Sequence, residues 1–168
     1  MTTSVAAADW IKRLAEDERR RDALRVKEGE AAARKADLIR LNGRRLVGEL
    51  RETVTRDVEA FRDEFPGDGA RHLVVDATEA AGGFVVCKPA PGAVSLTVTP
   101  DLEAAAIVCH YRFTQTNGLP PREERIDVML VGGETLHMRH NGTGQVFATA
   151  EALSEFLLVP VFTGRPNR

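Results

Sequence analysis

The chain has 168 residues, of which 43% are hydrophobic and 29% charged, and its formal net charge is −2 at pH 7. These values are typical of a globular protein and give the whole molecule no strong attraction to nucleic acid or to a membrane surface. No window approaches the roughly 20 apolar residues of a membrane-spanning helix, and the first residues lack a signal-peptide pattern. We therefore expect a cytoplasmic protein, and the excess of arginine over lysine is typical of a GC-rich bacterial genome.

The segment from about Thr3 to Glu64 is predicted to be helical, because it is rich in Ala, Arg, Glu and Leu and contains no proline. The sequence Phe65-Pro66-Gly67 ends it. Gly29 and Gly43 are the positions where we expect a bend or break. This division predicts a helical segment over residues 1–64 and a second domain over residues 70–168.

The two parts of this helix differ in pattern. From residue 39 onward, large apolar residues recur mostly in steps of three, four and seven, which predicts a buried stripe. The stripe consists of Ile39, Leu46, Val47, Leu50, Val54, Val58 and Phe61, with Leu41 off it. Between residues 10 and 34 the charges dominate, and the pairs Asp9/Arg13 and Asp17/Arg21 are spaced to support a solvated helix.

The length of the predicted helix also limits its placement. About sixty helical residues would extend roughly 90 Å at 1.5 Å per residue, whereas a domain of about 100 residues has a radius of gyration near 13 Å. The helix must therefore fold back, protrude or pair with another chain.

The second half is predicted to be an antiparallel sheet of six or seven strands, because short turns separate segments of alternating apolar and polar residues. With the long helix before it and a short helix after it, the chain belongs to the α+β class. The expected strands are Leu73–Ala77, Phe84–Lys88, Val94–Thr99, Ala105–Thr114, Arg125–Val131, Thr135–His140 and Gln145–Ala148.

The turn at Gly132-Gly133 decides which side of the next strand is buried. A two-residue loop would pair Val131 with Glu134, whereas a three-residue loop pairs Val131 with Thr135 and turns Leu136 and Met138 inward. We favour the second. After the sheet, Thr149 is expected to cap a helix from Ala150 to about Leu158 that Pro160 ends.

The wetter face of the sheet holds the first candidate site. If the alternation holds, five basic residues lie together on three neighbouring strands beside Asp127, where they could bind phosphate or carboxylate. They are His110, Arg112, Arg125, His137 and Arg139. The alternative is an ordinary solvated sheet face.

The second candidate site is the first part of the helix, where Trp10, Ile11, Leu14 and Leu24 are spaced among charged residues and are predicted to contact a protein partner. Between Asp9 and Glu64 there are fifteen Lys and Arg against fourteen Asp and Glu. This balance is typical of a solvated or partner-binding helix, and nucleic-acid binding is not favoured.

Catalytic chemistry has little support in the sequence. Cys109 and His110 are adjacent on a strand and point to opposite faces, and both cysteines, Cys87 and Cys109, are expected to be buried thiols. His137 and His140 also face apart, so we expect no metal, and no glycine-rich cofactor motif is present. We expect a non-enzymatic assembly or adaptor protein that self-associates or binds a partner through its helix. The alternative is a module that binds an anionic ligand or nucleic acid.

Overall fold

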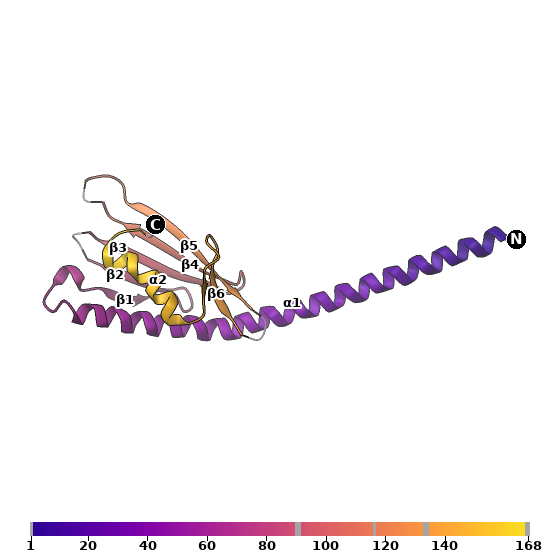
Figure 1. The fold of residues 1–168 in the computed structure, drawn as a ribbon, viewed down its shortest axis with the longest axis horizontal. Helices are drawn as coiled ribbons and strands as arrows, with labels where there is room; N and C mark the ends of the chain where they lie inside the picture. Colours follow the sequence, from indigo (N-terminus) through magenta and orange to yellow (C-terminus); the bar gives the residue numbers. More distant parts are fainter. Residues whose placement is uncertain (1, 90–91, 116, 133–134, 167–168) are drawn as a thin grey trace. The chain divides into compact units, whose positions relative to one another are not determined.

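The computed structural model describes residues 2–89, 92–115, 117–132 and 135–166, with side chains from residue 8 onward. The chain forms two compact units, residues 1–37 and 38–168. A single helix, α1 (Thr2–Asp63), contributes to both (Figure 1). The boundary between the units therefore falls within the helix, whereas the sequence had suggested a division at its end, because residues 39–61 supply a large part of the core of the second unit.

A break at Gly29 or Gly43 was expected and does not occur, since α1 is continuous through both glycines. Gly43 has a packing role, because a Cβ added there would lie 2.9 Å from Leu102 Cδ2 and 3.3 Å from Leu130 Cδ1. Gly29 and Gly48 have no heavy atom within 4 Å of the same position. One glycine costs a helix interior only about 1 kcal/mol relative to alanine, which a long helix can tolerate.

The sheet of the second unit is a meander in which all neighbouring strands are antiparallel, as predicted. Strand order follows the chain. The strands are β1 (Val74–Ala77), β2 (Phe84–Lys88), β3 (Val94–Asp101), β4 (Ala106–Phe113), β5 (Arg122–Val131), β6 (His137–His140) and β7 (Val146–Phe147). A short 3-10 turn, Gly69–Arg71, joins the end of α1 to β1, and Asp68 caps it by accepting a hydrogen bond from Ala70 N.

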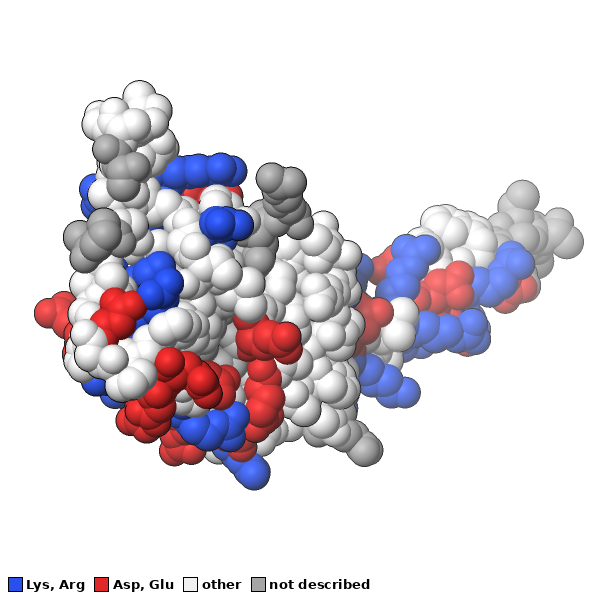
Figure 2. Space-filling view, turned by 60° about the vertical axis from the view of Figure 1, so that its left-hand side comes forward, with Lys and Arg blue, Asp and Glu red and all other residues white. Residues whose placement is uncertain are grey.

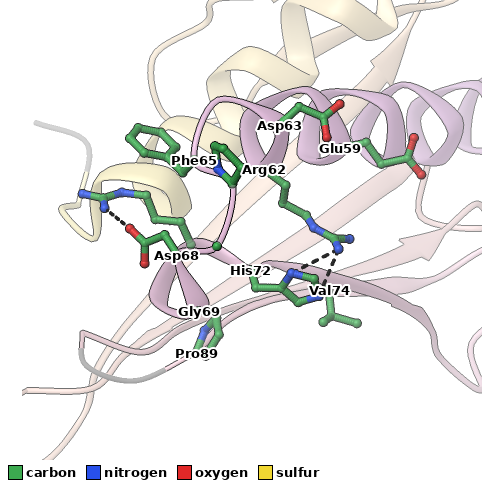
Figure 3. A pocket seen from close by; sticks show the side chains of 12 residues that line it. Glu59, Arg62, Asp63, Phe65, Asp68, Gly69, His72, Val74 and Pro89 are labelled. Atoms are coloured by element: carbon green, nitrogen blue, oxygen red, sulfur yellow. Dashed lines mark hydrogen bonds and ion pairs between the residues drawn. The ribbon is translucent and has the colours of Figure 1, made fainter.

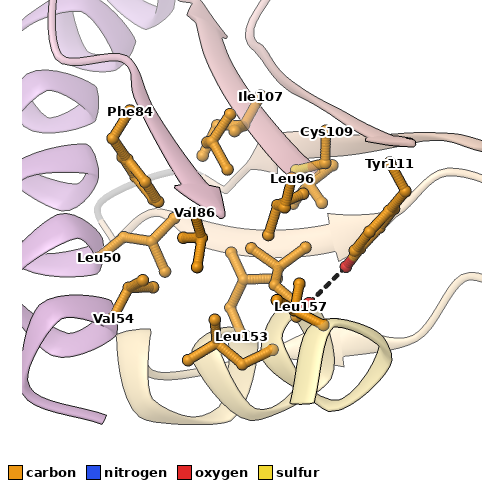
Figure 4. Packing of buried hydrophobic residues seen from close by; sticks show 14 of the residues in the cluster. Leu50, Val54, Phe84, Val86, Leu96, Ile107, Cys109, Tyr111, Leu153 and Leu157 are labelled. Carbon is orange, nitrogen blue, oxygen red and sulfur yellow. Dashed lines mark hydrogen bonds between the residues drawn. The ribbon is translucent and has the colours of Figure 1, made fainter. Parts of the chain in front are cut away.

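One face of this sheet is covered by residues 38–63 of α1 and by α2 (Ala150–Thr163), and together they enclose a single apolar core. Figure 4 shows Leu50 and Val54 of α1 and Leu153 of α2 meeting the inward side chains of the strands. Burying one such side chain contributes about 1.5–3 kcal/mol. The predicted stripe of α1 is confirmed, since Ile39, Val47, Leu50, Val54 and Val58 are buried and Leu41 is 76% exposed.

Two strands extend further than predicted. β3 continues through Pro100 to Asp101, and the turn that follows occupies residues 102–105, with Ala105 at a φ of 51°. Proline is tolerated there because β2 begins opposite Val98, so that β3 beyond Val98 has a neighbouring strand on one side only. β5 begins at Arg122 and not at Arg125, because β4 is long enough to pair with Arg122, Glu123 and Glu124.

Val131 lies opposite His137 and not opposite Thr135. Glu134, the partner in the other predicted pairing, lies outside the described residues. The partner differs by two residues from the favoured prediction, and a shift of two leaves every side chain on its predicted face. Met138 is accordingly buried, and Leu136 packs against the core while partly exposed.

The C-terminal helix was expected to end before Pro160, and this was wrong. Thr149 caps it as predicted, by accepting a hydrogen bond from Ala152 N at 3.2 Å, but the helix continues through Pro160 to Thr163. Packing stabilises the last turn, because Val161 is fully buried and the ring of Phe162 stacks on Phe61 at 4.1 Å. Gly164, in the left-handed conformation, then ends the helix.

The two helix glycines at 43 and 48 allow a matched test of packing. We expect Gly48→Ala to raise the free energy of unfolding by about 0.5–1 kcal/mol, because the added methyl group meets open space. Gly43→Ala should raise the free energy of unfolding less than Gly48→Ala does, or lower it, because the added methyl group must displace the Leu102 side chain. Urea unfolding monitored by circular dichroism measures both, and equal gains would contradict the described packing.

A buried hydrogen bond fixes α2 to the sheet, since the Tyr111 hydroxyl donates to the Leu157 carbonyl at 2.6 Å (Figure 4). Tyr111→Phe should lower the free energy of unfolding by about 1–2 kcal/mol, because a buried carbonyl loses its donor. Thr55→Val is the control, because it removes a hydroxyl that donates to Arg51 O at 2.8 Å near the surface. Equal losses in urea unfolding would mean that burial adds nothing to this bond.

Candidate functional site

The helical segment of residues 8–37, here called the docking segment, carries the most exposed apolar groups of the first unit. Trp10 and Ile11 are each 52% exposed, Leu14 is 51% exposed and Leu24 57%. Trp10, Ile11 and Leu14 are separated by one to four residues, so they form one patch on the helix, and Leu24 follows further along on the side of Trp10. The four predicted partner-binding residues are therefore accessible for contact.

Ion pairs between neighbouring turns support this helix in solvent. Arg20 lies 3.8 Å from Asp17, Arg21 3.2 Å from Glu18, and Arg25 3.5 Å from Asp22. The sequence had suggested the pairs Asp9/Arg13 and Asp17/Arg21, each four residues apart. In the structure Asp17 pairs with Arg20 and Arg21 pairs with Glu18, each three residues apart. Asp9 and Arg13 are not within ion-pair distance. On the face shown in Figure 2, acidic and basic groups of this segment are intermixed, whereas duplex DNA binding requires a clustered basic face.

The open face of the sheet holds the five basic residues of the other prediction, but it does not bring all five together. His110 lies directly opposite Arg125, and Arg112 lies opposite Glu123, two residues along the strand. Arg139 lies opposite Met129 and His137 opposite Val131. At about 3.4 Å per residue, these two are roughly 14 and 20 Å along the sheet from Arg125.

Carboxylates also accompany the central cations. His110 Nε2 lies 3.6 Å from Glu123 Oε2, and Arg125 Nε donates to Asp127 Oδ1 at 3.0 Å. Glu123 was not among the predicted site residues, because the predicted strand began at Arg125. The length of β4 could have indicated this residue, because a strand of eight residues can pair along its whole length only with a neighbour that begins before Arg125. The open face is thus less cationic than predicted.

A hollow of about 840 Å³ lies beside the end of α1 and the start of β1 (Figure 3). Two pairs of its polar groups contact each other. Arg62 Nη2 lies 2.9 Å from Nε2 of His72, and Arg71 bonds Asp68 while its guanidinium lies 4.5 Å from the centre of the Phe65 ring. The bond from Arg71 holds the pKa of the Asp68 carboxyl below its usual range.

The groups with the most perturbed protonation lie in the core. Burial raises the pKa of the Cys109 thiol to about 12, with a further contribution from the Asp127 carboxylate. Burial also raises the pKa of Tyr111. A thiol of this kind is not a nucleophile at neutral pH. Cys87 is exposed on the open sheet face, contrary to the expectation that it is buried, because its side chain alternates with the inward Val86.

The described part of the chain contains no group of three or more His, Cys, Asp or Glu residues that could hold a metal ion. Within the same ranges, no helix combines the length and the apolar character needed to cross a membrane. Comparisons with models of protein families, with curated proteins and with solved structures gave no match.

The perturbed thiol predicts a pH dependence of stability. An unfolded cysteine loses its proton near its ordinary pKa of about 8.5, whereas native Cys109 keeps its proton until about pH 12. The native state binds more protons over this window, so the free energy of unfolding should fall as pH rises from about 8.5 towards 12. In Cys109→Val the free energy of unfolding should fall less over this pH range, because the variant lacks the titrating thiol. Parallel curves of stability against pH for the two proteins would show that the thiol does not contribute.

Proposed function

We propose that the chain is a non-enzymatic assembly or adaptor protein that contacts another protein, or another copy of itself, through the docking segment. The observation that carries the proposal is the patch of Trp10, Ile11 and Leu14, each about half exposed on a helix. Large apolar anchors at such spacing are the usual means by which a helix binds in a groove, and tryptophan is prominent among residues that dominate binding energy.

The residues that continue this patch restrict the form of any self-association. Steps of three and four from Trp10 and Leu14 reach Asp17, Arg21 and Leu24. In a parallel pair Asp17 would face its own copy, which is unfavourable. In an antiparallel pair centred near residue 19, Asp17 faces Arg21 and Leu14 faces Leu24 of the other copy.

The alternative function, binding of an anionic ligand by the open sheet face, has weaker support. Two of its basic residues are roughly 14 and 20 Å along the sheet from Arg125, and Glu123 and Asp127 accompany His110 and Arg125. Titration of Arg112→Ala plus Arg139→Ala with oligonucleotides at low salt remains its test.

The assembly proposal is tested with the full chain and two matched variants. Trp10→Ser plus Leu14→Ser removes the patch, whereas Val26→Ser plus Leu41→Ser removes two exposed apolar side chains elsewhere on α1. Light scattering after size exclusion should give at least twice the 18.4 kDa mass of one chain for the wild type and the control, and the monomer mass for the patch variant.

If the wild type is a monomer, the same three proteins are used for affinity capture from the source cells. We expect a protein that binds the wild type and the control but not the patch variant. A monomeric wild type that captures no such protein would contradict the proposal. For a self-associating wild type, Asp17→Arg should weaken the dimer and Asp17→Arg plus Arg21→Asp should restore it, but only if the pairing is antiparallel.

A further inference from the structure

A second hollow, here called the Arg44 hollow, lies where α1 passes two turns of the sheet. It has a volume of about 570 Å³, within the range of about 300–1,000 Å³ that is usual for small-molecule sites. Its walls are residues of α1, of the connection between β1 and β2, and of the turn between β3 and β4. They are Arg40, Arg44, Val47, Ala81, Gly82, Pro100, Leu102 and Glu103.

The floor of the Arg44 hollow is apolar and held in place by close packing. Val47 belongs to the core and is 2% exposed, and Leu102 packs closely on α1, since a Cβ added at residue 43 would lie 2.9 Å from Leu102 Cδ2. Gly82 has a φ of 78°, and a Cβ there would lie 3.3 Å from Val47. Glycine at this position therefore lets the turn approach the helix and form one wall.

The rim of the hollow is cationic on the side of α1. Arg40 and Arg44 are one helical turn apart, which places their Cβ atoms about 6 Å from each other on one side of the helix. Across the described ranges, the Arg44 guanidinium makes no hydrogen bond or ion pair. Glu103 is the one carboxylate that lines the hollow, against two guanidinium groups.

The geometry points to a binding site for a small monocarboxylate with an apolar tail. A guanidinium matches the two oxygens of a carboxylate in a bidentate pair, while the half-buried Pro100 and Leu102 offer contact to a hydrocarbon tail. A nucleotide fits less well, because among the described residues no aromatic ring lines the hollow for base stacking. Glu103 also disfavours a ligand with several negative charges. This site is separate from the docking segment and does not depend on its role.

The test uses the full chain and sodium octanoate below its micelle concentration, with binding followed by NMR titration. We expect saturable binding in the millimolar range. Arg44→Gln should weaken it about two- to fivefold, the effect expected of one partly exposed charge, and Glu103→Gln should strengthen it about twofold. A weaker affinity in Arg44→Gln together with a stronger affinity in Glu103→Gln is the result expected when an anion binds near both side chains.

Arg45→Gln is the matched control, because it removes the same charge one residue away, where Arg45 pairs with Glu49 at 3.2 Å outside the hollow. It should change octanoate binding less than Arg44→Gln. Octylamine, with a similar tail and the opposite charge, should bind more weakly than octanoate. Absence of binding, equal affinity for both probes, or equal effects of Arg44→Gln and Arg45→Gln would overturn the inference.

Discussion

The second unit depends on one constraint: its sheet has an apolar face that must be covered. Among the described residues there is no second sheet to cover it. A seven-stranded antiparallel sheet of this pattern must obtain its cover from helices. Residues 38–63 of α1 and all of α2 supply it, and the bond from Tyr111 to Leu157 fixes α2 at the centre of the sheet. This need explains why α2 continues through Pro160, since ending there would expose Val161 and separate Phe162 from Phe61.

The same constraint explains what sequence reasoning could predict. Strand order, alternation and the stripe of α1 follow from periodicity and turn residues, and they are confirmed. The pairing of Val131 and the length of α2 were mispredicted, because they depend on contacts between distant segments. Exposed Cys87 shows a related limit, since an apolar run around a residue does not say which face of the strand it occupies. The Arg44 hollow was missed because Gly82 and Leu102 come together only in the folded chain.

The groups with the most strongly raised pKa values, Cys109 and Tyr111, are enclosed by the core. Several surface acids and bases contact each other in pairs, such as His110 with Glu123. The surfaces that differ from an ordinary solvated exterior are the apolar patch of the docking segment and the apolar floor of the Arg44 hollow.

The position of Trp10 allows the first unit to be followed by tryptophan fluorescence independently of the second unit. It is the single tryptophan of the chain, and Tyr111 in the core is the single tyrosine. Indole emission therefore reports the surroundings of the docking segment and does not respond directly to the core. Emission that shifts to shorter wavelength without any change in the circular dichroism of the sheet would indicate that the segment has become covered. Loss of the sheet signal with unchanged emission would indicate melting of the core alone.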